Sequence, residues 1–151
     1  MRLLLSLMVS ALITMNVFAA PIASFVPGES KGITVPQAED GEWESVEVDG
    51  RQAICNKTAM PYLYFKVDQD LRAKLKGDVY AVVEFYNDGF TPVKTQYDTE
   101  ADNYPYGPAF ILSGNNKWEK TLLRLENTAF AGQENFGTDF RFGPVDDPTI
   151  G

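Results

Sequence analysis

The segment 78–98, DVYAVVEFYNDGFTPVKTQYD, constrains the fold of this chain more than any other. In its first half, small and apolar residues recur at every second position from Val79 to Phe85. This period of two, with β-branched and aromatic residues, predicts a strand that is buried mainly on one face. Asn87-Asp88-Gly89 follows, and Asp-Gly supplies the positive φ angles of a tight turn, so we expect a hairpin over 78–98.

Other stretches show the same alternation and are separated by Gly and Asn turns. They are 32–35, 45–48, 51–55, 60–67, 109–113, 117–125 and 138–142. Asp49-Gly50 predicts a second hairpin between 45–48 and 51–55, and only 68–77 has helical spacing, enough for one or two turns. About eight short strands at roughly ten-residue spacing predict one all-β domain, a two-layer antiparallel β-sandwich or jelly roll.

The N-terminus has the pattern of a secretory signal peptide. Met1-Arg2 is followed by the apolar run 3–18 and by Ala19-Ala20. The run is short for a membrane span, and cleavage after Ala19 is favoured because cleavage after Ala20 would leave Pro21 next to the cut. An uncleaved anchor is the alternative. We therefore expect a secreted protein, extracellular or periplasmic, with no membrane span after cleavage.

Composition divides the chain into four segments and excludes several classes of function. We expect a signal peptide at 1–19, a Pro-, Gly- and Ser-rich linker at 20–31, a β-sandwich module at 32–143 and a polar tail at 144–151. Lys and Arg total 13 against 21 Asp and Glu, a net charge of −8, which argues against nucleic acid as a partner. The chain has no histidine, which excludes Ser-His-Asp and Cys-His catalysis and His-containing zinc sites.

Cys55 is the single cysteine of the chain, so no internal disulfide is expected. Alternation in 51–55 places it on a strand, where a small buried apolar residue is the simplest interpretation. A reactive thiol is the alternative and would need an exposed, cationic setting.

Aromatic and polar residues in the predicted loops are the candidates for sugar binding. Aromatic rings offer flat apolar faces to the C–H groups of a sugar ring, and amides and carboxylates bind its hydroxyls. The turn 86–90 and the loop 99–108 are the expected binding loops, although the two loop tyrosines could instead pack the loop against the sandwich. The candidates are Tyr104, Tyr106, Asn87, Asp88, Phe90, Asn103 and Trp43.

Acidic residues suggest two further kinds of site, a metal site and a catalytic pair. Asp40, Glu42 and Asp139 could hold a structural calcium ion through hard oxygen ligands, although an acidic surface also supplies carboxylates without a metal. No other cofactor is expected. A glycosidase needs two carboxylates across a cleft, and Glu84 with Asp98 is one pair to consider; a solvated sheet face explains Glu84 equally well. We expect no enzymatic activity.

Several motifs in this order resemble a family of non-catalytic β-sandwich modules with a galactose-binding-like jelly-roll fold, found in secreted bacterial proteins, often beside glycoside hydrolase domains. The resemblance covers roughly 32–142. The matching residues are Tyr64-Phe65, Val67-Asp68, Glu84-Phe85-Tyr86, Asp88-Gly89, Gln96-Tyr97-Asp98, Trp118 and Asp139-Phe140-Arg141.

The resemblance implies association with a glycan or polysaccharide. One departure concerns the end of the module, where family members usually add a further apolar strand but this sequence has GPVDDPTIG at 143–151. We therefore expect that the jelly roll lacks its last strand, which would leave an open edge for another protein domain. The function expected from the sequence is a carbohydrate-binding module without catalytic activity; the alternative is a structural or protein-interaction module.

Overall fold

The computed structural model describes residues 4–10, 21–57, 60–102 and 105–145. Strands account for most of the described chain, and the helical segments are α1 (Gln69–Arg72) and the 3-10 turns η1 (Ala73–Leu75) and η2 (Asn135–Gly137). The strands are β1 (Leu4–Ser10), β2 (Ala23–Val26), β3 (Glu29–Lys31), β4 (Ile33–Thr34), β5 (Trp43–Val48), β6 (Arg51–Asn56), β7 (Leu63–Val67), β8 (Gly77–Tyr86), β9 (Pro92–Tyr97), β10 (Tyr106–Ile111), β11 (Trp118–Thr128) and β12 (Phe140–Pro144).

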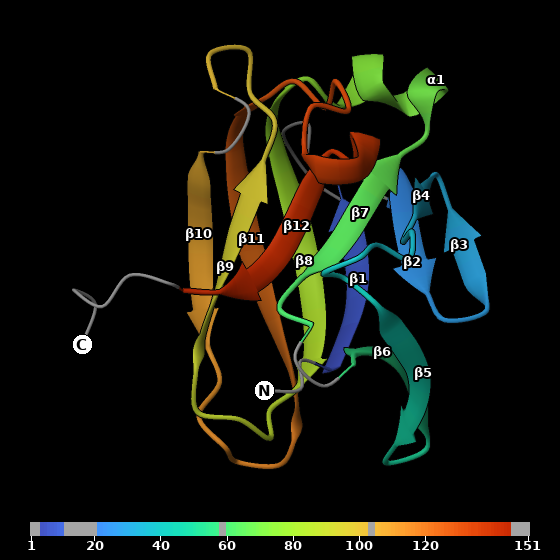
Figure 1. The fold of residues 1–151 in the computed structure, drawn as a ribbon, viewed down its shortest axis with the longest axis vertical. Helices are drawn as coiled ribbons and strands as arrows, with labels where there is room; N and C mark the ends of the chain where they lie inside the picture. The colour runs from blue at the N-terminus through green and yellow to red at the C-terminus, as the bar shows by residue number, and fades with distance from the viewer. Residues whose placement is uncertain (1–3, 11–20, 58–59, 103–104, 146–151) are drawn as a thin grey trace, which may run out of the picture.

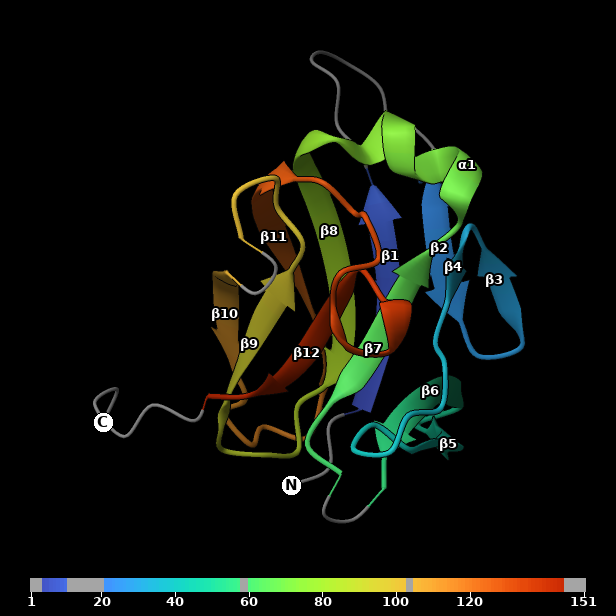
Figure 2. The ribbon, with the colours of Figure 1, turned by 45° about the horizontal axis from the view of Figure 1, so that its top comes forward.

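The strands form two antiparallel sheets that face each other (Figures 1 and 2), so the predicted all-β sandwich is confirmed. One sheet has the order β11-β8-β1-β2-β3, with the β5–β6 hairpin attached to β1 through β6. The other has the order β10-β9-β12-β7-β4. In the part of the chain that the structure describes, no helix is long and apolar enough to cross a membrane.

The core lies between the two sheets and is rich in aromatic rings. The predicted alternation of β8 is confirmed, because Val79, Val83 and Phe85 are all buried and belong to the core. On the opposite sheet, the rings of Phe65 and Phe140 stack with their centroids 4.8 Å apart. Burying one such side chain stabilises the fold by roughly 1.5–3 kcal/mol. Phe65 and Phe140 are paired neighbours within one sheet, and the apolar layer that they form with the buried side chains of β8 is a main source of stability.

The hairpin predicted over 78–98 is wrong, although both of its strands exist. β8 pairs with β1 and β11, whereas β9 pairs with β10 and β12 in the other sheet. None of Asn87, Asp88 and Gly89 has a positive φ angle. The segment 87–91 therefore crosses from one sheet to the other, because the apolar faces of β8 and β9 are buried against each other across the core.

Asn87 makes this crossing possible. Its side chain is fully buried, and Oδ1 accepts hydrogen bonds from the backbone N–H groups of Ser113 and Gly114 at 2.6 and 3.0 Å. Its Nδ2 donates to Glu119 Oε2 and Ser113 Oγ, both at 2.9 Å. The asparagine thus ties the crossing segment to the loop 112–117, and it has no free group for a ligand.

The second hairpin and the short helix are confirmed. β5 and β6 pair as far as Val48↔Arg51, and the turn residues Asp49 and Gly50 have φ angles of 51° and 72°. Positive φ at both turn positions suits the right-handed twist of the two strands. Between β7 and β8, α1 and η1 together span 69–75, as the spacing predicts.

The N-terminal region differs from the expected organisation. The predicted linker 20–31 contains β2 and β3, which pair as a hairpin, because Ala23 and Phe25 alternate and bury their side chains in the core. Residues 4–10, inside the predicted signal peptide, form β1 and pair with β8 from Leu4↔Tyr86 to Ser10↔Tyr80. The signal peptide stays a prediction, and its removal would take β1 out of the sheet.

The open edge predicted beside the last strand is also absent from the described sheet. β12 lies between β9 and β7 and pairs with both. One edge strand of this sheet, β10, pairs with β9, contains Pro108 and has a break in its pairing register between Tyr106 and Ala109. A proline and an irregularity are features that hinder pairing of an edge with another chain.

We predict that Asn87→Ala destabilises the fold, because it leaves several buried backbone and side-chain groups without partners. The expected loss in the free energy of unfolding is roughly 2–4 kcal/mol, measured by urea denaturation. The exposed neighbour provides the control, since Asp88→Ala should change stability by less than about 0.5 kcal/mol. Equal stability of the two variants would contradict the role assigned to Asn87.

Candidate functional site

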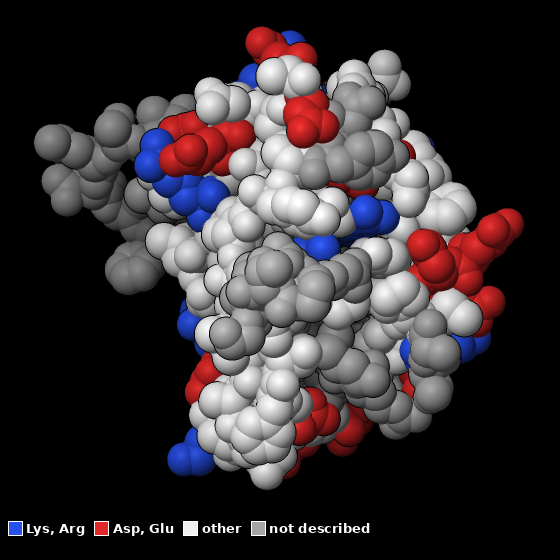
Figure 3. Space-filling model, turned by 60° about the vertical axis from the view of Figure 1, so that its left-hand side comes forward, with Lys and Arg blue, Asp and Glu red and all other residues white. Residues whose placement is uncertain are grey.

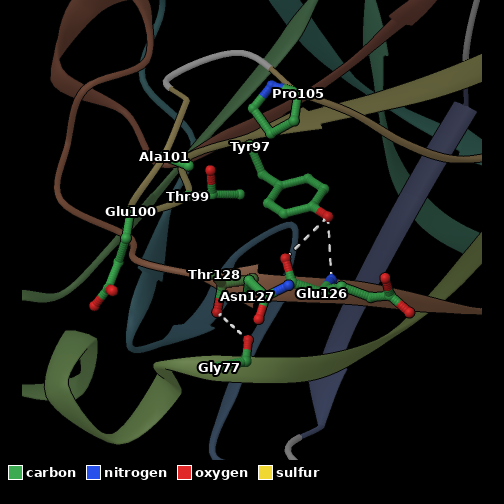
Figure 4. Close-up of a pocket in the computed structure, with 9 residues that line it drawn as sticks. All are labelled: Gly77, Tyr97, Thr99, Glu100, Ala101, Pro105, Glu126, Asn127 and Thr128. Carbon is green, nitrogen blue, oxygen red and sulfur yellow. Dashed lines mark hydrogen bonds between the residues drawn. The ribbon is translucent and has the colours of Figure 1, made fainter.

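An open pocket of about 550 Å³ lies at one end of the sandwich, beside residues 99–101 and Pro105 (Figure 4). These residues belong to the segment 99–108 that the sequence predicts to bind ligand. The other walls come from the end of β9, the start of β8 and the end of β11. The lining residues are Gly77, Tyr97, Thr99, Glu100, Ala101, Pro105, Glu126, Asn127 and Thr128.

Two hydroxyl groups fix the inner wall of the pocket. Tyr97 Oη donates to the backbone oxygen of Glu126 at 3.2 Å and accepts from the N–H of the same residue at 3.1 Å. Thr128 Oγ1 lies 2.6 Å from the backbone oxygen of Leu75 and 2.8 Å from that of Gly77. These bonds hold the end of β11 against β8 and β9. Burial also raises the pKa of the Tyr97 hydroxyl.

The exposed groups of the pocket are polar and suit a ligand rich in hydroxyls. Asn127 is exposed and carries an amide, which can donate and accept hydrogen bonds at once. The side chains of Glu100 and Glu126 extend to opposite sides of the pocket (Figure 4). Glu100 lies 3.8 Å from Lys76 and Glu126 lies 3.1 Å from Arg124, so each carboxylate has a cation beside it.

The structure does not bring the predicted sugar-binding residues together. Asn103 and Tyr104 lie outside the described residues. Tyr106 is 70% exposed at the start of β10, and Phe90 is 83% exposed on the crossing segment 87–91. β9 separates these two aromatic residues, and six residues of extended chain span roughly 20 Å. The two predicted binding loops therefore lie at opposite ends of the sandwich.

The remaining sugar-binding candidates have different settings. Asp88 is exposed beside Phe90, whereas Asn87 is buried and fully hydrogen-bonded. Trp43 is half-buried, donates its Nε1–H to the backbone oxygen of Val35 at 3.2 Å and packs edge-on against Phe25. Its ring therefore has a structural role in the β5 region.

The predicted calcium ligands do not form a common site. Asp40 accepts a hydrogen bond from the Tyr64 hydroxyl at 3.2 Å, and Glu42 pairs with Lys57 at 2.8 Å. Asp139 is fully buried and is bound by Arg72 at 3.1 Å. Among the described residues, no group of three or more Asp, Glu, Cys or His side chains is placed to hold a metal ion.

The two carboxylates considered as a catalytic pair lie on different sheets. Glu84 is on β8 and pairs with Arg51 and, at 2.6 Å, with Lys120. Burial acts to raise the pKa of Glu84, but the bonds to these two cations outweigh it and hold the pKa below its ordinary value. Asp98 follows β9 in the other sheet, where it is completely buried.

A network on the outer face of the five-stranded sheet was not identified from the sequence. Arg141 on β12 donates from Nε and Nη2 to Gln96 Oε1 at 2.9 and 2.7 Å, and from Nη1 to the Tyr64 hydroxyl at 3.1 Å. All three residues are buried. The three residues belong to three separate motifs of the family resemblance. Each is the outward-facing residue of a strand with alternating pattern, and this alternation was the signal in the sequence that could have identified the network.

Glu134 lies beside this network in an unusual state. The residue is 2% exposed, neither carboxyl oxygen has a hydrogen-bond partner, and Oε2 lies 3.7 Å from Arg141 Nε. Burial raises the pKa of Glu134 to about 7, and the nearby Asp98 raises it further while Arg141 acts in the opposite direction. The carboxyl group therefore changes charge near neutral pH.

No family model, curated protein or solved structure matches this chain.

We predict that the stability of the protein falls as pH rises from about 4.5 to about 7. In this window the folded chain keeps the Glu134 proton that the unfolded chain has already lost, so a higher pH favours unfolding. Asp98 and Asp139, whose pKa values burial also raises, act in the same direction at lower pH. Glu134→Gln should remove most of this dependence and raise stability at pH 8 by roughly 1–3 kcal/mol.

Urea denaturation at several pH values checks this prediction. Parallel pH profiles for the wild-type protein and the E134Q variant would show that Glu134 does not titrate in this range.

Proposed function

We propose that this protein is a secreted, non-catalytic carbohydrate-binding module with a galactose-binding-like jelly-roll fold. The glycan binds in the pocket beside residues 99–101 and Pro105. The observation that carries this proposal is the pocket itself, an open cavity lined by hydroxyl, amide and carboxylate groups next to a tyrosine and a proline.

The size and chemistry of the pocket support a sugar ligand. A volume of about 550 Å³ lies within the range of small-molecule sites and leaves room for one or two sugar rings. The half-buried ring of Pro105 supplies apolar contact, Tyr97 lies buried in the pocket wall, and Asn127 and Thr99 supply polar contact. This combination of flat apolar and hydrogen-bonding groups is the one that a sugar ring requires.

The charges around the pocket favour a neutral glycan. Both carboxylates of the lining have a cation nearby, which leaves no unpaired basic group to attract an acidic sugar. The proposal that the protein is exported depends on the N-terminal pattern of the sequence, and such a location would bring the pocket into contact with extracellular or periplasmic polysaccharide.

A second candidate function is protein interaction at the opposite end of the sandwich. Phe90 and Ile111 are 83% and 70% exposed there, and Ile111 lies directly opposite Pro92 in the β-sheet register. Figure 3 shows uncharged atoms at the lower end of the molecule, with acidic and basic groups at their border. Exposed apolar groups of this kind are typical of surfaces that contact another protein.

We predict that Ala101→Trp blocks the pocket and weakens glycan binding by at least about tenfold, because a large ring on the exposed loop fills the cavity. The purified protein is first tested on soluble neutral and acidic polysaccharides by affinity electrophoresis, and the affinity for the retained glycan is then measured by calorimetry. Phe90→Ala is the matched control, since it removes an exposed aromatic ring at the other end.

A folded wild-type protein that retains no polysaccharide would overturn the proposed function. Unchanged binding by the A101W variant would show that the glycan binds elsewhere.

A further inference from the structure

The outer face of the five-stranded sheet carries a row of polar and aromatic residues that the proposed pocket does not use. Tyr106, Gln96, Arg141 and Tyr64 occupy paired positions on β10, β9, β12 and β7. Adjacent strands are about 4.8 Å apart, so the row extends over roughly 14 Å. The hydrogen bonds from Arg141 to Gln96 and Tyr64 make the centre of this row a fixed support.

Three aromatic rings lie on this support. The ring of Tyr106 has Lys94 Nζ 4.3 Å from its centroid and is itself 70% exposed. The guanidinium carbon of Arg141 lies 4.2 Å from the centre of the Tyr62 ring. Phe136 stands edge-on against Tyr64 at 5.2 Å and is 51% exposed. The rings are thus held from beneath while part of their surface faces solvent.

The backbone is adapted to hold two of these rings. Phe136 has a φ angle of 61°, a left-handed conformation that costs energy for a residue other than glycine. Gly143 lies under Tyr62, and a Cβ atom at this position would be 2.4 Å from the tyrosine ring. Glycine therefore lets the ring lie close against the sheet. An exposed phenylalanine that keeps a left-handed backbone conformation of unfavourable energy indicates that its ring has a role other than packing.

The two cations at the centre of this face, Arg141 and Lys94, have partners within the protein. Arg141 is placed beside Glu134 and between two tyrosine rings, and the Lys94 ammonium group lies against Tyr106. In Figure 3, the basic groups on the visible face lie in several separate places among uncharged atoms. Exposed rings beside buried cations match a neutral ligand with flat apolar faces.

We propose that this outer face is a second binding surface for neutral sugar rings, which stack on Phe136 and Tyr106. The inference rests on the proposed function, because it assumes that a glycan is the ligand. In this proposal, the rings bind the parts of a longer glycan that extend beyond the pocket. Tyr62, held over Gly143, packs against Tyr64, and Phe136 rests on the same tyrosine.

The test uses neutral oligosaccharides of increasing length, taken from the polysaccharide that the wild-type protein retains. Calorimetry with the wild-type protein should show affinity that increases with length. In the Phe136→Ala and Tyr106→Ala variants, affinity for the longest oligosaccharide should fall about fivefold to tenfold, whereas affinity for the shortest should stay the same. Leu122→Ala is the control, since Leu122 is 58% exposed on a strand of the other sheet.

A fourth variant tests the geometry without removing a ring. Gly143→Ala should displace Tyr62 and reduce the affinity for long oligosaccharides in the same way. Circular dichroism checks that each variant is folded, and Tyr62→Ala should reproduce the effect if Gly143→Ala lowers stability.

The outcomes separate this inference from the proposed function. Loss of binding only in the A101W variant, with F136A and Y106A behaving as wild type at every length, would overturn the second surface and keep the pocket. Loss in F136A and Y106A, with A101W unchanged, would keep the surface and overturn the pocket. Affinity that does not depend on oligosaccharide length would also contradict the second surface.

Discussion

The contact between the two sheets is the interaction on which the rest of this structure depends. β8 presents its buried side chains to the aromatic residues of β7 and β12, and the stacked pair Phe65–Phe140 lies in this layer. No disulfide supports the described chain, in which the single cysteine, Cys55, is buried. Stability therefore comes from burial of apolar surface. This burial orients the strands, and the strands determine the position of each loop at the ends of the sandwich.

Buried polar side chains then fix the loops. Asn87 binds the loop 112–117 at one end. At the other end, Asp98 Oδ2 accepts from the N–H groups of Ala131 and Gln133 at 2.9 and 2.8 Å, and Asp139 accepts from that of Gly132 at 2.9 Å. Because an unpaired backbone group is costly inside a protein, these side chains determine where the segment 129–139 lies. The proposed pocket and the aromatic face both border this end of the sandwich.

The segment 78–98 shows which structural features a sequence pattern predicts correctly and which it does not. Its alternation correctly predicts both strands and the buried face of β8, because the period of two depends only on local geometry. The turn signal at Asn87-Asp88-Gly89 predicts a hairpin, and this is wrong because the same residues also suit a crossing between sheets. At Asp49-Gly50 the same type of signal is confirmed, since β5 and β6 have no alternative partner of comparable length beside them.

The sequence alone determined the fold class, most strand positions, the short helix and the identity of the buried apolar residues. These follow from local periodicity and turn chemistry, which act over a few residues. Tertiary structure decided which strands are neighbours, that 20–31 joins the sandwich, and that Phe90 and Tyr106 lie at opposite ends. It also decided that Tyr64, Gln96 and Arg141 meet on one face, as their hydrogen bonds join residues up to 77 positions apart. Contacts of this range depend on how the two sheets pack, and no local pattern contains that information.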